Sequence, residues 1–272
     1  EECLNMKKIS RRSFLAAAAV SAAALALTAC GGSASTASSA AASSVAASSE
    51  AASTSAAADE LTTVEAGKLT MATNATFPPY EMTTDAGTIE GIDVDTAQAI
   101  AEKLGLELQI DDMDFDAALL SVQQGKADIA MAGITVTDER MAVMSFSDSY
   151  ATGIQSVIVP EGSDIASVDD LAGKKIGTQR GTTGYLYCSD DFGEDAVVAY
   201  DNGLTAVQAL NNGQVDAVVI DNEPAKAYVE SNPGLKILDT SYAEEDYAIG
   251  MNKSNTALLE AVNAALEELK AD

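Results

Sequence analysis

The chain contains no histidine and no tryptophan among its 272 residues. This composition excludes histidine-based acid–base catalysis, serine–histidine–aspartate triads and imidazole metal sites. Cysteines occur at positions 3, 30 and 188, without the spacing of metal ligands or of a disulfide framework. We therefore expect no metal and no cofactor. The groups left to do chemistry are carboxylates, hydroxyl groups, backbone amides and guanidinium groups.

Two similar segments place such polar groups at the ends of strands. Leu119–Met131 and Val207–Val219 each contain the end of an apolar-faced helix, a glycine, an aspartate and a buried strand. A glycine there suits the left-handed conformation that ends many helices. In open α/β sheets the ligand binds outside the carboxyl ends of the strands. We therefore expect a site between two lobes, with Gly133 and Asp221 facing it.

The elements that would position these residues alternate between short apolar strands and amphipathic helices, which is typical of parallel sheets covered by helices. In the first half, the periodicity predicts strands at 68–73, 106–110 and 127–134 and helices at 93–104 and 115–124. In the second half, it predicts strands at 175–177, 197–200 and 215–220 and helices after 183, at 204–211 and at 224–229.

Six motifs follow one another in order along the chain: Asn74–Glu81, Gly91–Asp95, Ala132–Arg140, Phe146–Tyr150, Gly177–Gly184 and Ile220–Pro224. Together they resemble the extracytoplasmic solute-binding proteins of ABC importers, in the branch for polar amino acids, over nearly all of 66–272. The resemblance implies a two-lobed, periplasmic-binding-protein-like α/β fold of type II, in which each lobe is a mostly parallel sheet flanked by helices. We expect lobe 1 to comprise 66–157 and 248–272, lobe 2 to comprise 158–247, and a hinge near 156–160 and 243–250.

The resemblance also implies a pocket that matches both charged groups of a free amino acid. Arg140 would clamp the ligand's carboxylate through charge-assisted hydrogen bonds, and Asp221 would accept hydrogen bonds from its ammonium. Thr183 would contact the carboxylate from the second lobe, because the amides at a helix start favour an anion. The remaining implied site residues are Asn74, Phe77, Asp93, Phe115, Ala132, Gly133, Thr135, Gln179 and Thr182.

Simpler roles exist for several of these residues. Arg140 could be a solvated helix residue, Asp221 could cap the following helix, and Phe77 could pack in a turn. Asn74 stands where many cation-preferring members of the family carry aspartate, which weakens an arginine or lysine assignment. Asp93 could still meet a basic side chain and Gln179 a polar one. Ligands of the glutamine, arginine/lysine and cystine classes therefore stay open.

The amino-terminal segment has the order of a bacterial export signal. Basic residues after Met6 precede an apolar stretch from Phe14 to Ala29, which is too short to span a membrane comfortably. Cys30 follows it in a sequence that resembles a lipobox, and two adjacent arginines also resemble a twin-arginine signal. We expect 1–29 to be a signal peptide with upstream residues, and 30–60 to be a lipidated cysteine followed by a disordered Ser/Ala linker.

Charge limits the partners of this chain. Aspartate and glutamate total 42 against 15 lysines and arginines, for a net charge of −27, which excludes nucleic acid as a partner. We expect a monomer on the outer face of the bacterial cell membrane, held there by a lipid on Cys30. It would deliver its ligand to an ABC permease with a cytoplasmic ATPase.

The main prediction is therefore a binding protein and not an enzyme. One alternative is an enzyme of the same fold, such as a cyclic-acid dehydratase, with Glu81 or Glu223 as the catalytic carboxylate. Another is a sensory lipoprotein that binds an amino acid without importing it. The chain stops at Leu269–Asp272, where members of the family continue through another helix, so a truncated reading frame or a fragment is one interpretation of this end.

Overall fold

The computed structural model describes residues 61–239 and 241–271. The predicted export signal, Cys30 and the Ser/Ala linker lie outside these residues. Within them, no helix combines the length and the apolar character needed to cross a membrane. The two-lobed α/β architecture predicted from the sequence is present, with one large sheet in each lobe.

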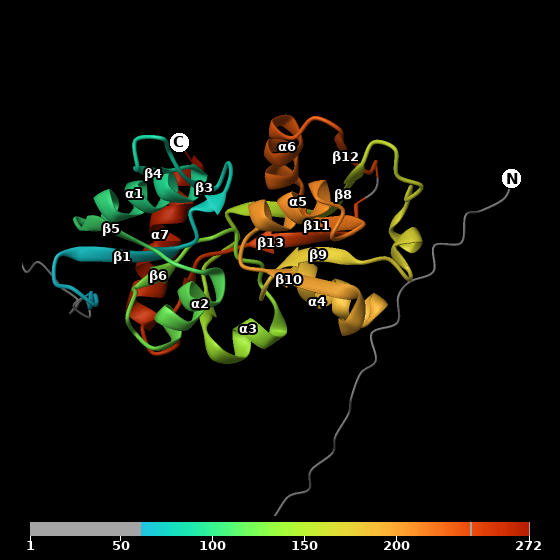
Figure 1. Cartoon of the computed structure of the whole chain (residues 1–272). Helices are drawn as coiled ribbons and strands as arrows, with labels where there is room; N and C mark the ends of the chain where they lie inside the picture. The colour runs from blue at the N-terminus through green and yellow to red at the C-terminus, as the bar shows by residue number, and fades with distance from the viewer. Residues whose placement is uncertain (1–60, 240, 272) are drawn as a thin grey trace, which may run out of the picture. The chain divides into compact units, whose positions relative to one another are not determined.

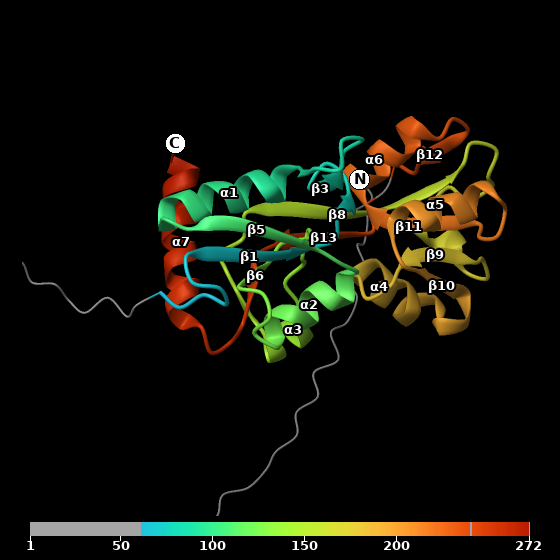
Figure 2. The ribbon, with the colours of Figure 1, turned by 60° about the vertical axis from the view of Figure 1, so that its left-hand side comes forward.

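The sheet of lobe 1 has five strands and is built around β1. In spatial order they are β5 (Glu107–Asp112), β1 (Lys68–Thr73), β6 (Ile129–Ala130), β14 (Gly250–Met251) and β7 (Ser145–Phe146). Its helices are α1 (Ile92–Leu104), α2 (Phe115–Gln123), α3 (Asp138–Val143) and α7 (Thr256–Ala271). Alternate β1 side chains point to opposite faces: Leu69 and Met71 pack with α1 and α7, and Ala72 packs with α2. Figures 1 and 2 show α1 and α2 on opposite sides of the sheet.

The sheet of lobe 2 repeats this plan. Its strands are β10 (Val197–Tyr200), β9 (Ile176–Gln179), β11 (Ala217–Asp221), β8 (Ala151–Pro160), β12 (Leu235–Ile237) and β13 (Ala243–Tyr247). Its helices are α4 (Thr183–Phe192), α5 (Gly203–Asn211), α6 (Asn222–Ser231) and the short 3₁₀ turns Val168–Leu171 and Glu194–Ala196. The strand orders β5-β1-β6 and β10-β9-β11 are equivalent, which explains the repeated sequence segment.

The predicted strands and helices differ from the observed ones in three ways. Each large sheet is mixed, because antiparallel pairs extend its parallel part: β14 pairs with β6 and β7 in lobe 1, and β8 pairs with β11, β12 and β13 in lobe 2. The predicted strand at 127–134 shortens to Ile129–Ala130, and the residues after it run along the pocket. A small sheet of β2 (Thr76–Phe77), β3 (Glu81–Thr83) and β4 (Ile89–Glu90) was not predicted.

The hinge also differs from the prediction. The segment 156–160 belongs to β8 and pairs with β11 and β12, so it is part of the second sheet, and the predicted lobe boundary at 157 falls inside a strand. The chain crosses from β7 to β8 at 147–150 and returns between β13 and β14 at 248–249. Beside these crossings, Ala151–Ile154 pairs only with β13, and this two-stranded ribbon runs between the sheets (Figure 2). A ribbon anchored in one sheet and free of the other is a natural place for the lobes to bend.

The aspartates of the repeated segment tie neighbouring strands together. Both oxygens of Asp128 accept backbone N–H groups, from Val64 at 2.8 Å and from Thr70 at 2.8 Å. Asp216 accepts the N–H of Lys175 at 2.8 Å, at the equivalent place in lobe 2. Each of these two aspartates therefore fixes the entry of its strand into the sheet.

We expect Asp128→Ala to lower the free energy of unfolding by about 1–3 kcal/mol, because it leaves two backbone donors without their acceptor. Urea unfolding of the purified protein measures this change. Asp216→Ala is the matched control, since its carboxylate is exposed and accepts one N–H, and we expect a smaller loss. An equal loss in the two variants would contradict the role assigned to Asp128.

Candidate ligand-binding site

A pocket lies between the two lobes and is lined by residues of both. From lobe 1 it is lined by Asn74, Phe77, Glu81, Phe115, Ala132, Gly133, Thr135 and Arg140, and from lobe 2 by Gln179, Thr182, Thr183 and Asp221. Of the twelve residues predicted for the site, the structure brings eleven together here. Asp93 lies behind the lining, and Glu81 is an additional member that the sequence analysis did not include in the binding set.

Arg140 brings a buried guanidinium to the pocket. Its helix, α3, starts at Thr137, whose hydroxyl accepts the Arg140 backbone N–H at 3.2 Å. The guanidinium donates to the carbonyl oxygen of Thr135 at 2.8 Å and, across the lobes, to that of Gly181 at 3.1 Å. It also lies 5.3 Å from the ring centre of Phe115. Since a guanidinium has five N–H donors, donors remain for a carboxylate.

Asp221 brings a buried carboxyl group from the opposite lobe. It ends β11, is 7% exposed and accepts a hydrogen bond from the Tyr247 hydroxyl. Burial first, and then the nearby charge of Glu245, raise the pKa of Asp221 to about 7. An ammonium group bound here would restore a favourable partner to its ionised form.

The start of α4 completes the lobe 2 side of the pocket. The Thr182 hydroxyl caps this helix by accepting the N–H of Tyr185 at 3.4 Å and donates to the carbonyl of Gln179 at 2.8 Å. The free amides of the first turn favour an anionic group. Gln179 donates to the side-chain oxygen of Asn74 at 2.9 Å, which is a second hydrogen bond between the lobes.

Asp93 supports the pocket from behind. It is fully buried, and its two oxygens accept the N–H of Gly133 at 3.0 Å and the hydroxyl of Tyr150 at 2.8 Å. Burial raises the pKa of Asp93 to about 6. Gly133 has φ +55°, and a Cβ there would lie 2.7 Å from the Phe77 ring. Asp93 therefore holds a backbone turn that only glycine fits.

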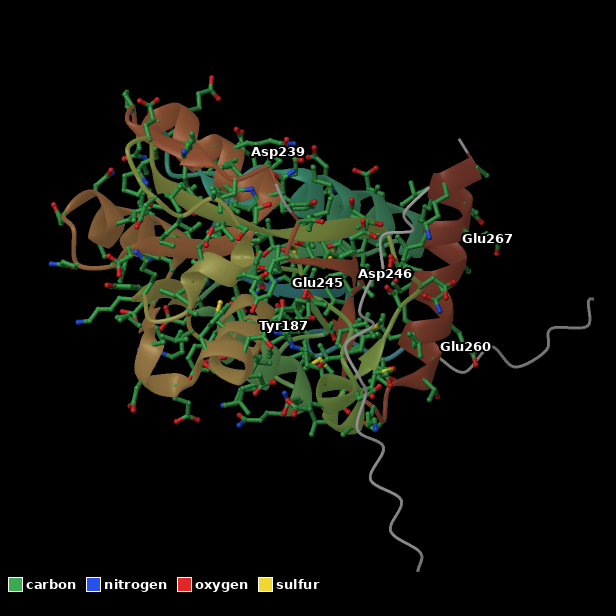
Figure 3. The ribbon with its side chains drawn as sticks, turned by 90° about the vertical axis from the view of Figure 1, so that its right-hand side faces the viewer. Tyr187, Asp239, Glu245, Asp246, Glu260 and Glu267 are labelled. Atoms are coloured by element: carbon green, nitrogen blue, oxygen red, sulfur yellow. The ribbon has the colours of Figure 1, made fainter. Side chains whose placement is uncertain are left out.

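Sequence reasoning missed two buried acids near the pocket. Glu81 on β3 is fully buried, and neither carboxyl oxygen has a hydrogen-bond donor among the described residues. Glu245 on β13 accepts from the Thr135 hydroxyl at 3.1 Å and from the Gln155 amide at 2.9 Å. Figure 3 marks Glu245 in the interior near Tyr187, and Glu260 and Glu267 on the outside of α7.

Both acids left a signal in the sequence. Glu81 belongs to the motif Asn74–Glu81. Glu245 stands in the acidic run 244–246, and residues 244–247 alternate between exposed and buried, as expected for a strand with one covered face. Among the described residues, no cluster of cysteine, aspartate and glutamate could hold a metal ion.

The structure has two α/β lobes with a polar pocket between them. A guanidinium enters this pocket from one lobe and a carboxyl group from the other, which is the arrangement of a two-lobed solute-binding protein. The chain belongs to the bacterial extracellular solute-binding proteins, family 3, whose sequence profile matches residues 69–272. This confirms the resemblance seen in the motifs, and it makes the protein extracytoplasmic by family.

Three known proteins illustrate the similarity. A probable histidine-binding protein of Neisseria gonorrhoeae is 34% identical over 74% of this chain and 77% of its own. The arginine-bound form of truncated ArgBP from T. maritima is 40% identical, with a TM-score of 0.71, over 75% of this chain and 96% of its own. An ancestral arginine-binding protein bound to glutamine is 42% identical, with a TM-score of 0.71, over 76% and 93%. These relatives are binding proteins, and they differ in the amino acid that they bind.

The two titrating aspartates predict how stability depends on pH. Their pKa values in the folded protein, about 6 for Asp93 and about 7 for Asp221, exceed the unfolded value of about 3.9. The folded state therefore binds more protons between about pH 4 and about pH 7, and their contribution to stability is lost as the pH rises through this range. We expect the ligand-free protein to melt at a higher temperature at about pH 5.5 than at about pH 7.5.

Asp221→Asn should make this pH dependence shallower, because it removes one of the titrations that depend on burial. The pKa of Glu81 is also raised by burial, and its contribution is the same in both variants compared here. The large negative charge of the chain acts in the same direction. The control is therefore Asp216→Asn, which removes an exposed carboxylate from the same lobe and should keep the steeper dependence. Equal slopes of melting temperature against pH in the two variants would rule out Asp221 as the source.

Proposed function

We propose that this protein is the substrate-binding component of an ABC importer and that it binds a cationic amino acid, L-arginine, between its lobes. The observation that carries the proposal is that Arg140 and Asp221, from opposite lobes, line one buried pocket. An amino acid that leaves water needs a partner for both its carboxylate and its ammonium, since the cost of desolvation otherwise exceeds the gain.

The proposed pose follows from the donors and acceptors around the pocket. The carboxylate of the ligand lies against the Arg140 guanidinium and the first turn of α4, where N–H donors are available. Its ammonium lies against the carboxyl group of Asp221. Phe77 and Phe115 supply apolar surface for the stem of the side chain. One ligand molecule then touches both lobes, so it favours the state in which the lobes are together.

The charge of the ligand's side chain is inferred from the acids around the pocket. Glu81, Asp93, Asp221 and Glu245 are all buried in this region, and Arg140 is the one guanidinium in the lining. A zwitterion adds no net charge, whereas arginine adds a positive one that reduces the repulsion between these carboxylates. Glu81 supplies the acid that Asn74 does not, so asparagine at position 74 is compatible with a cationic ligand. The similarity to arginine-binding proteins supports the same choice.

Glutamine is the second candidate. Asn74 and Gln179 place two amide groups in the lining, joined by a hydrogen bond across the lobes. A terminal amide of a ligand could take part in this pairing. The ancestral arginine-binding protein bound to glutamine is an example of a related pocket that holds this ligand.

The wider assignment rests on the family and on the sequence of the first sixty residues. As a binding protein and not an enzyme, the chain would release its ligand unchanged to a permease. Its predicted lipid on Cys30 and its Ser/Ala linker would keep it near that permease. Metabolic labelling of the producing cells with a radioactive fatty acid would test the anchor. We expect the protein to incorporate the label and Cys30→Ser to lose it.

A panel of the common amino acids, screened by thermal shift and then by titration calorimetry, tests the function. We expect L-arginine to raise the melting temperature and to bind one-to-one. Arg140→Ala should weaken this binding by about 2–5 kcal/mol, because it leaves a desolvated carboxylate without its partner. Arg180→Ala is the control, since its side chain is 58% exposed and lies outside the pocket. Near-normal affinity in Arg140→Ala would remove Arg140 from the site.

Close approach of the lobes predicts a second effect, at Gly181. This residue has φ +73°, and a Cβ there would lie 1.8 Å from a carboxyl oxygen of Asp116, which belongs to α2 in lobe 1. We expect Gly181→Ala to weaken ligand binding by up to about tenfold, because the exposed Asp116 side chain has to move before the lobes can come together. Calorimetry measures the loss.

Two further variants separate the clash from the backbone strain. Gly213→Ala introduces the same side chain at φ +67°, with no atom within 4 Å of the new Cβ, and we expect normal affinity there. Asp116→Ala combined with Gly181→Ala should restore part of the binding, because it removes the group that the Cβ meets. If the double variant binds no better than Gly181→Ala, closure is not limited by this contact.

A further inference from the structure

The Glu81 carboxyl group is buried without any compensation that would keep it ionised. It is fully buried at the pocket wall, and neither oxygen receives a hydrogen bond from the described residues. The ionisable groups that face it from the surrounding elements are Tyr80, Asp93, Asp112, Tyr150, Asp221 and Tyr228. None of these is a cation. Burial and the neighbouring carboxylates, of which Asp93 contributes most, place the pKa of Glu81 well above its usual range.

Glu81 and Asp93 form a buried pair of acids. The Asp93 backbone N–H donates to the carbonyl oxygen of Tyr80, the residue before Glu81, at 2.9 Å, and both acidic side chains are fully buried. Two neighbouring buried carboxyl groups do not both ionise, because like charges repel, so one proton stays on the pair. Asp93 already receives hydrogen bonds from the Gly133 N–H and the Tyr150 hydroxyl. Because these donors stabilise the charge on Asp93, the proton belongs on Glu81.

We propose that Glu81 and Asp93 share one proton in the empty pocket and that the positively charged end of the ligand's side chain displaces this proton to the solvent. One O–H bond on Glu81 breaks, the proton passes to water or buffer, and an ion pair with the guanidinium replaces it. The charge of the Glu81 carboxylate is therefore balanced in both states, by the proton in the empty pocket and by the guanidinium in the occupied one. This inference rests on the cationic ligand of the proposed function.

The surroundings of the Glu81 and Asp93 pair come mainly from lobe 1, so the pair does not depend on closure of the lobes. Asp93 and Asp112 belong to lobe 1, as Glu81 does, and Tyr150 stands beside the lobe 1 crossing. Only Asp221 and Tyr228 come from lobe 2. The carboxyl pair is therefore assembled before a ligand arrives. Since binding releases a proton, the affinity for arginine increases with pH over the range in which the empty pocket holds that proton.

Titration calorimetry of the purified full chain tests the proton release directly. L-arginine is titrated at about pH 6.5 in several buffers that differ in their enthalpy of ionisation, and the slope of observed heat against that enthalpy gives the number of protons released. L-citrulline, which has a neutral urea group in place of the guanidinium, is titrated in parallel. Any proton that Asp221 loses to the ligand's ammonium is common to both ligands and cancels in the difference.

We expect arginine to release close to one proton more than citrulline, and the ratio of its dissociation constant to that of citrulline to fall by up to about tenfold per pH unit below the titration of Glu81. Glu81→Gln keeps the shape of the side chain without the exchangeable proton, so it should remove the difference between the ligands and weaken arginine binding. If arginine releases the same number of protons as citrulline, or if that number is unchanged in Glu81→Gln, the shared proton is overturned and the proposed function is not affected. Failure of arginine to bind in any buffer would contradict the cationic ligand and the proton exchange with it.

Discussion

The buried guanidinium of Arg140 is the interaction on which the pocket depends. Removing a guanidinium from water is costly, and burial does shift its pKa downward. Two backbone carbonyls, one from each lobe, satisfy part of its hydrogen-bonding capacity. The nearest compensation by charge is indirect, since Glu245 contacts Thr135 and not Arg140 itself. A carboxylate that enters the pocket therefore finds a cation with unused donors and no closely bonded anion to displace.

The cost of burying a charge also applies to the acids of the pocket, where the buried groups are negative. Several carboxyl groups are buried in a chain that already has a large negative charge, and only some of them receive strong hydrogen bonds. Asp93 has two donors, whereas Glu81 has none. The difference assigns them different functions: Asp93 holds the turn at Gly133, and Glu81 stays available to whatever enters the pocket. Buried acids without donors are rare where they serve only the fold, which is why Glu81 points to a ligand.

Much of this organisation could be predicted from the sequence, because it follows from local patterns. The strand 197–200 and the helix that ends at Gly105 both depend on periodicity and on turn chemistry within a short segment. The position of the hinge could not be predicted in this way. In the sequence, Val157 and Ile158 are typical residues of a buried strand. Only their long-range pairing with β11 shows to which lobe they belong.

Most site residues could be predicted because they belong to the six motifs. A residue that is buried only by pairing with a distant segment of the chain could not be predicted in this way. Glu245 lies outside the six motifs, and its neighbours Glu244 and Asp246 are acidic and exposed. Its burial arises from the pairing of β13 with β8, between residues almost 90 positions apart. Asp93 is the reverse case: its motif is part of the resemblance, and its carboxylate binds the Gly133 N–H and the Tyr150 hydroxyl behind the pocket lining.

The buried position of Glu245 couples the hinge to the pocket. Glu245 lies on the ribbon that joins the lobes, and its carboxylate binds Thr135 of lobe 1 and Gln155 at the start of the lobe 2 sheet. Thr135 in turn presents its carbonyl to Arg140. Bending of the ribbon would move Glu245 relative to at least one of these partners, so the two hydrogen bonds cannot both be kept at every hinge angle. The conformation in which both are made is also the one in which Arg140 reaches Gly181 in the opposite lobe. The hinge and the carboxylate-binding side of the pocket therefore favour the same arrangement of the lobes, and a ligand that strengthens one also stabilises the other.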